Sequence, residues 1–146
     1  RRHDSPLEFD LAVATRQSSD NPVYYVQYAH ARIRSIWRQV PEQGLAVPPL
    51  GQIDLAPLSA PEELALIKRL LQFPEVVRDA ARALEPHRVA YWLGELAGAF
   101  HPYYKNHRVL QDDRALALAR LALCTAVGQV IANGLDLLGV RAPESM

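Results

Sequence analysis

Two tyrosines and an arginine recur at helical spacing near the start of the chain. Tyr25, Tyr28 and Arg32 lie three and four residues apart, so at about 100° per residue they fall within roughly 60° of one another on a helix. Phenol rings stack on unpaired nucleobases, and a guanidinium pairs with a phosphate or a base edge. The spacing therefore fits a surface for unstacked bases, although spacing alone favours the alternative in which the rings only pack beside a core face.

A second group of rings and cations occupies residues 101–108, which combine two tyrosines, two histidines, a lysine, an asparagine and an arginine. Pro102 lies within this segment and indicates a helix end nearby. Segments at helix ends often carry function. The alternative is a surface segment whose charges only solvate a helix terminus.

Catalytic and metal-binding patterns are absent from the sequence. No serine stands in a nucleophile-elbow motif, and no glycine-rich phosphate loop is present. The five histidines, at positions 3, 30, 87, 101 and 107, form no i, i+4 pair, so we expect no metal site. Cys124 is the only cysteine, which excludes an internal disulfide and favours a reducing cytosol.

The composition is that of a water-soluble globular domain. The 146 residues are 49% hydrophobic and 22% charged, with sixteen basic residues balancing sixteen acidic ones. That balance argues against sequence-blind binding of long nucleic acids, so local patches must provide any RNA affinity. The apolar runs are short for a bilayer span, and Arg1–Phe9 lacks a secretory leader. We therefore expect a cytoplasmic protein with no membrane contact.

Helical periodicity predicts an all-α bundle of about five to six helices with one long proline-rich loop. The predicted helices cover residues 22–39, 61–73, 75–84, 86–101 and 112–132, the last with room to extend to 138. Asn21 or Asp20 caps the first of them. Proline and glycine recur through residues 41–60, which therefore form the loop.

Prolines and glycine set the predicted helix boundaries. Pro74 is expected to break one helix, and Pro102 to kink or split another near His101. Asp112 or Asp113 is expected to cap the last helix, and Gly139 to stop it. A short helix is also predicted near residues 7–15.

Several other aromatic and charged residues receive structural interpretations. Trp37 and Trp92 fall on apolar helix faces and are predicted to lie in the core. His30 is expected to be a hydrogen-bonded structural histidine. Arg34 and Arg38 point away from the core, where a solvated face is favoured over a phosphate contact.

Five segments of the chain together resemble the C-terminal, DALR-type anticodon-binding domain of class I arginyl-tRNA synthetases. The first is Tyr-Val-Gln-Tyr-Ala-His-Ala-Arg, which resembles the first helix of that domain. In order along the chain, the five segments are residues 25–32, 61–68, 85–90, 119–123 and 133–140. Their order and spacing cover nearly the whole chain, so together they are far more specific than any one segment.

The resemblance implies RNA-binding roles for particular residues. In relatives, the tyrosines and arginine at the positions of Tyr25, Tyr28 and Arg32 face the anticodon loop, and so does the tyrosine at the position of Tyr104. Arg108 stands where some eukaryotic relatives have a tryptophan, so guanidinium stacking or a phosphate contact is expected to replace ring stacking there.

The end of the chain resembles the family's Pro-x-Arg-Met ending. In relatives the terminal methionine lies beside the anticodon loop, which implies a thioether contact with a base for Met146. Ser145 replaces the family's arginine, and Pro102 replaces a residue that is usually not proline. Chain ends are commonly frayed, and that is the default expectation here.

The resulting hypothesis is recognition of the arginine-tRNA anticodon stem-loop, within an arginine–tRNA ligase. Residues 1–20 would lead from a catalytic domain of the same polypeptide, and residues 21–146 would form the helical anticodon-binding domain. The family's ATP-dependent chemistry resides in a separate domain with a His-x-Gly-His-like element, which this sequence lacks. We thus expect this chain to bind no cofactor and to catalyse no aminoacylation by itself. The parent enzyme is expected to use ATP and to be a monomer. The alternative is a helical protein–protein interaction module with no RNA role.

Overall fold

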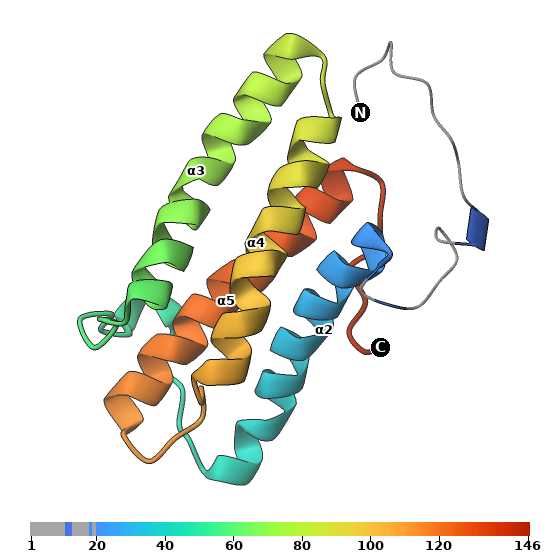
Figure 1. Ribbon diagram of the computed structural model, residues 1–146. Coiled ribbons are helices and arrows are strands. Elements are labelled where there is room, and N and C mark those ends of the chain that lie inside the picture. The colour runs from blue at the N-terminus through green and yellow to red at the C-terminus, as the bar shows by residue number, and fades with distance from the viewer. Residues whose placement is uncertain (1–10, 13–17, 19) are drawn as a thin grey trace.

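Four α-helices form the described part of the chain, which is residues 11–12, 18 and 20–146 of the computed structural model (Figure 1). They are α2 (Pro22–Gln39), α3 (Pro61–Ala83), α4 (His87–Asn106) and α5 (Arg114–Leu137), with single 3-10 turns η1 (Pro41–Gln43) and η2 (Leu50–Gln52) after α2. No strand occurs among these residues, and the predicted all-α class is confirmed. Of the helix predicted near residues 7–15, only Leu11 and Ala12 lie within the described residues, and both are helical.

The ends of α2 and α5 follow from local capping. The Asn21 side chain accepts hydrogen bonds from the backbone N–H groups of Val23 (3.1 Å) and Tyr24 (3.5 Å), so the predicted cap is confirmed. Asp113 caps α5 by accepting from the N–H of Leu116 at 3.1 Å. Helix α5 takes the longer of its two predicted extents, and Gly139 follows it with a left-handed φ of 69°.

The predicted break at Pro74 and the predicted split at Pro102 are wrong. Helix α3 continues through Pro74, and α4 continues through Pro102 to Asn106. Each proline removes only one N–H donor, and both are exposed, so the lost hydrogen bond falls on the side of the helix that water reaches. Packing along the opposite side holds both helices together, which is why the described residues contain fewer helices than predicted.

Helices α4 and α5 form the centre of the bundle, and α2 and α3 flank them (Figure 1). Both α2 and α3 pack on α4 and on α5. Helix α5 is long and apolar enough to cross a membrane by length and composition, with a mean hydropathy of 1.8. Since its neighbours cover it on several sides, that apolar character serves the core of the bundle.

Close helix contacts define the core. Gly134 of α5 approaches α4 so tightly that an added Cβ would lie 2.7 Å from Cδ2 of Leu93. Trp92 is buried, as predicted, while Trp37 is half-buried and its Nε1 donates to Oγ1 of Thr125 at 2.9 Å. Burial raises the pKa of the Cys124 thiol to about 12, which leaves it protonated and unreactive.

The loop at residues 41–60 closes one end of the bundle. Apart from η1 and η2 it lacks regular structure, as its prolines predict. Leu58 anchors it in the core, and Nη2 of Arg114 donates to the carbonyl oxygen of Ala46 at 3.2 Å. The loop is therefore tied to the start of α5.

Candidate functional site

Tyr25, Tyr28 and Arg32 lie on one edge of α2, as their spacing predicts. The guanidinium carbon of Arg32 is 4.4 Å from the ring centroid of Tyr28, and its Nη2 is 3.4 Å from the Tyr28 hydroxyl. All three side chains are half-buried. They are therefore held in place while each keeps part of its surface open to solvent.

Tyr104 brings a second ring to the same guanidinium from α4. The Arg32 guanidinium carbon is 5.2 Å from the Tyr104 ring centroid. One cation thus lies within cation–π distance of rings from two helices. Such a guanidinium keeps its planar donors in a fixed direction, which favours bidentate contact with a phosphate or base.

His101 joins α4 to α2 within this cluster. Its Nδ1 lies 3.1 Å from Nη1 of Arg32, and its Nε2 lies 3.1 Å from the carbonyl oxygen of Tyr25. A guanidinium only donates, so Nδ1 accepts and Nε2 carries the proton that is donated to Tyr25. The ring centroid is also 4.4 Å from that of Tyr25. His101 is therefore neutral and fixed in one tautomer.

The surroundings of His101 support the neutral form. Burial lowers the pKa of His101 below its ordinary value, the hydrogen bond to the Tyr25 carbonyl opposes that change, and the positive charge of Arg32 lowers the pKa further. His101 lies in the predicted segment of residues 101–108, but its contact with Arg32, 69 residues away, was not predicted. One local signal existed, since His101 and Tyr104 are three residues apart and share a helix face.

Three adjoining hollows run along these side chains. The first, of about 350 Å³, is lined by Tyr24, Tyr25, Tyr28, Arg32 and His101. The second, of about 320 Å³, shares Tyr28 and Arg32 with the first and adds Tyr104 and Met146. The third, of about 350 Å³, shares Tyr104 with the second and reaches Arg108. All six residues predicted to bind RNA therefore line a series of adjoining hollows.

We call this surface the aromatic strip. It consists of Tyr24, Tyr25, Tyr28, Arg32, His101, Tyr104, Arg108 and Met146. Tyr24 was missed by the sequence analysis, and its ring stacks on that of Tyr28 with centroids 6.2 Å apart. Tyr103, in contrast, is only 1% exposed and belongs to the core.

Arg108 is exposed, and a buried ion pair fixes its main chain. Arg120 donates from Nη1 to the carbonyl oxygen of Arg108 at 3.0 Å and from Nε to Oε1 of Glu63 at 2.8 Å. Glu63, at 1% exposure, also accepts from the N–H groups of Ser59 and Ala60 at 2.9 Å each. This network joins α3, α5 and the end of the aromatic strip.

The pKa of Glu63 reflects that network. Burial alone would raise the pKa of the carboxyl group, but the hydrogen bonds from Ala60, Arg120 and Ser59 and the charge of Arg120 lower it overall. Glu63 is therefore ionised in the folded protein at neutral pH, and its charge is matched by that of Arg120.

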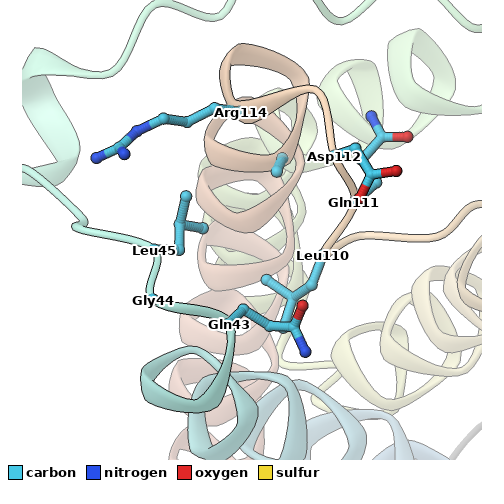
Figure 2. Close-up of a pocket in the computed structure, with 8 residues that line it drawn as sticks. Gln43, Gly44, Leu45, Leu110, Gln111, Asp112 and Arg114 are labelled. Atoms are coloured by element: carbon cyan, nitrogen blue, oxygen red, sulfur yellow. The ribbon is translucent and has the colours of Figure 1, made fainter.

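Figure 2 shows the residues that line a further hollow of about 350 Å³. It shares Gln43 and Leu110 with the third hollow and is bordered by Asp112 and Arg114. It has no aromatic lining, so we exclude it from the aromatic strip.

The structural role predicted for His30 is borne out by its contacts. His30 is buried, and its Nδ1 lies 2.8 Å from the carbonyl oxygen of Pro143, so its structural, hydrogen-bonded role is confirmed. Among the described residues no group of three or more histidine, cysteine, aspartate or glutamate side chains could hold a metal ion.

The sequence of this chain matches a known family of anticodon-binding domains. A family model described as the DALR anticodon binding domain matches residues 26–146. That match covers well over half of the chain, and the chain belongs to this family.

The relatives are arginine–tRNA ligases. One from Acidithiobacillus ferrooxidans is 53% identical over 146 residues, covering all of this chain and 25% of that protein. One from Syntrophotalea carbinolica is 55% identical, covering all of this chain and 26% of that protein. The chain thus spans about a quarter of the length of the curated relatives it matches.

Solved structures of such enzymes share the fold. A Campylobacter jejuni protein assigned as an arginyl-tRNA synthetase superposes with a TM-score of 0.85 at 29% identity, covering all of this chain and 31% of that one. The Thermus thermophilus arginyl-tRNA synthetase gives a TM-score of 0.69 at 41% identity, over 84% of this chain and 21% of that one.

Proposed function

We propose that this chain binds the anticodon stem-loop of arginine tRNA as a domain of an arginine–tRNA ligase. The observation that carries the proposal is the aromatic strip, in which rings from α2 and α4 gather around the Arg32 guanidinium. Family membership and identity above 50% to arginine–tRNA ligases support the same assignment.

Binding would follow from the chemistry of the strip. Anticodon bases that splay out of the loop would stack on Tyr25, Tyr28 and Tyr104, each stacked base contributing about 1 to 3 kcal/mol. Stacking hardly discriminates among bases, so identity must come from hydrogen bonds to their edges. Arginine anticodons share a middle cytosine, which we expect to be read in this way.

Catalysis would reside elsewhere in the parent enzyme. We assign residues 1–20 as a segment leading from the catalytic domain and residues 21–146 as the recognition domain. The parent enzyme would use ATP to attach arginine, while this chain supplies tRNA recognition only. We place the enzyme in the cytoplasm, as a monomer.

The rival function, docking of a partner helix, requires an apolar contact surface. The aromatic strip instead carries the cations Arg32 and Arg108 among its rings. These charges suit a polyanion far better than an apolar helix face. The protein-interaction alternative is therefore not favoured.

A salt titration with a labelled hairpin tests the proposal. The 146-residue chain should bind a hairpin with an arginine anticodon more tightly than the same hairpin with its middle cytosine replaced by guanine. Affinity should fall steeply between about 50 and 200 mM salt as counterions are released. A chain that binds neither hairpin, even at low salt, would contradict the proposal.

A further inference from the structure

The last residues of the chain lie along α2, against the expectation of a frayed end (Figure 1). Nε2 of Gln27 donates to the carbonyl oxygen of Arg141 at 2.7 Å, and His30 bonds the carbonyl oxygen of Pro143. Gln27 and His30 are three residues apart on α2, so the tail follows one face of that helix in the same direction.

Glu144 makes the final attachment of the tail. Its carboxylate lies 2.5 Å from Nε of Arg34, and its carbonyl oxygen accepts from Nη1 of Arg38 at 2.9 Å. Arg34 and Arg38 are four residues apart and continue the same helix face. Two arginines thus hold both the side chain and the main chain of one tail residue.

This attachment contributes little to the stability of the fold. The Arg34 and Glu144 side chains are 44% and 65% exposed, and exposed ion pairs typically contribute less than about 1 kcal/mol. The ion pair instead fixes the position of the last residues of the tail against α2. Two residues later, Met146 lines the second hollow together with Tyr28, Arg32 and Tyr104.

Gln27 and His30 hold the tail earlier, at Arg141 and Pro143, so Glu144 makes the last attachment before Met146. No hydrogen bond within the described part of the chain reaches Ser145 or Met146 beyond the Glu144 attachment. Ser145 also lacks the guanidinium that the family's usual arginine would provide at this point. The placement of Met146 therefore depends on Glu144.

We propose that Glu144 is a positioning residue that clamps the tail to Arg34 and Arg38, so that Met146 forms a wall of the RNA-binding strip. Arg34 and Arg38 then serve the tail, and Arg34 does not contact a phosphate directly. The inference rests on the proposed RNA-binding function and assigns how one wall of that site is held. The soft thioether would lie against a base face.

Met146 is the only methionine in the sequence, which gives a direct probe. In a chain prepared to begin at Arg1, ¹³C-methyl methionine labelling yields one resonance from the strip. We expect that resonance to shift on adding the arginine hairpin. In Glu144→Gln, the free resonance should move toward that of a disordered methionine. Hairpin affinity should fall about two- to fivefold, because the contact between the tail and the base is less often in place.

The sign of the affinity change distinguishes the clamp from simple electrostatics. Removing a carboxylate near RNA should by itself strengthen binding, whereas loss of the clamp weakens it. The double variant Glu144→Arg with Arg34→Glu restores the ion pair with its charges exchanged, and it should recover both affinity and the Met146 resonance. If Arg34 contacted a phosphate, the double variant would bind no better than Arg34→Glu.

A matched control is the Arg69–Glu95 pair, at 3.0 Å, where Glu95 is 64% exposed. Glu95→Gln should leave the Met146 resonance and hairpin affinity unchanged. If the wild-type chain binds the hairpin while Glu144→Gln binds equally or more tightly, or leaves the resonance in place, the clamp is overturned and RNA binding stands. If the wild-type chain binds no hairpin, the function itself fails.

Discussion

The aromatic strip and a larger hollow elsewhere in the described structure differ in chemistry more than in shape. That hollow, of about 540 Å³, lies between loop 41–60, α3 and α5, and we call it the apolar groove. It is lined by Leu50, Gly51, Leu55, Leu58, Ile67, Leu70, Leu71, Ala122, Leu123, Thr125, Ala126 and Gln129.

No charged side chain lines the apolar groove, whereas the strip places Arg32 and Arg108 among rings. A polyanion gains nothing from an aliphatic wall that lacks a counter-charge, but it gains stacking and ion pairing from the strip. The volume of a hollow therefore does not identify the RNA site of this molecule. The nature of the groups that line it does.

The largest expected effect is on stability. It concerns the Glu63–Arg120 ion pair, which joins the Arg108 end of the strip to the loop at residues 41–60. Glu63 holds the end of loop 41–60 through Ser59 and Ala60, and it holds Arg120 beneath Arg108. Glu63→Ala leaves Arg120 without its buried partner and should cost about 3 to 5 kcal/mol of unfolding free energy. Urea denaturation measures this.

The exposed Glu75–Arg78 pair, at 3.7 Å, is the control for Glu63. Glu75→Ala should change stability by less than about 1 kcal/mol. Because the folded-state pKa of Glu63 is lowered, its contribution is present above the ordinary value of 4.5 and is lost as the pH falls below that value. Equal costs for the two variants would contradict the network.

The next largest effect is on hairpin affinity, and it tests whether the strip rather than the groove binds RNA. Arg32→Ala removes a cation that contacts the rings of both Tyr28 and Tyr104, and it should cost about 1 to 3 kcal/mol of hairpin binding. That corresponds to roughly 5- to 150-fold in the dissociation constant. Circular dichroism should show an intact helical fold. Unchanged affinity would remove Arg32 from the site.

A smaller effect comes from His101 and depends on pH. Its folded-state pKa lies below the ordinary value of 6.5, so the unfolded chain takes up the proton first as the pH falls. Neutral His101 therefore contributes stability that is present above about pH 6.5 and is lost as the pH falls through that value toward the folded-state pKa.

His101→Gln should remove this dependence, so that the free energy of unfolding falls less between pH 7 and pH 5 than in the wild type. Denaturation midpoints measured at the two pH values give the comparison. His87→Gln is the control, since His87 lies at the start of α4 with its ring edge-on to Tyr91. A wild-type slope retained in His101→Gln would contradict the assigned tautomer and contacts.

The smallest effect should come from the groove. Leu71 is 76% exposed, so Leu71→Ser should change unfolding free energy by less than about 0.5 kcal/mol. Hairpin affinity should stay unchanged. A marked loss of affinity in this variant would mean that RNA reaches the groove.

The sequence predicted the local features of the strip well. The α2 edge follows from the spacing of Tyr25, Tyr28 and Arg32, and its start from Asn21, because both depend on neighbours within one or two helical turns. The contacts of His101 with Arg32, and of Glu63 with Arg120, join residues 69 and 57 positions apart, and no local pattern specifies them.

The wrong predictions, at the two prolines and at the end of the chain, also arise from contacts between distant residues. Pro74 and Pro102 disfavour helix locally, yet packing of α3 on α4 and of α2 on α4 keeps both helices continuous. The tail was expected to fray because its attachment to α2 depends on residues more than a hundred positions away. Tertiary contacts override local propensity in both cases.

The central claim, that the strip and not the groove receives the anticodon loop, is tested most directly by mapping hairpin binding on the ¹⁵N-labelled chain. We predict that amide resonances of residues 24–38, 101–108 and 141–146 shift on titration with the arginine hairpin, while those of Leu55, Leu71 and Ala126 stay in place. Shifts confined to the groove, with the residues of the strip unchanged, would contradict the account.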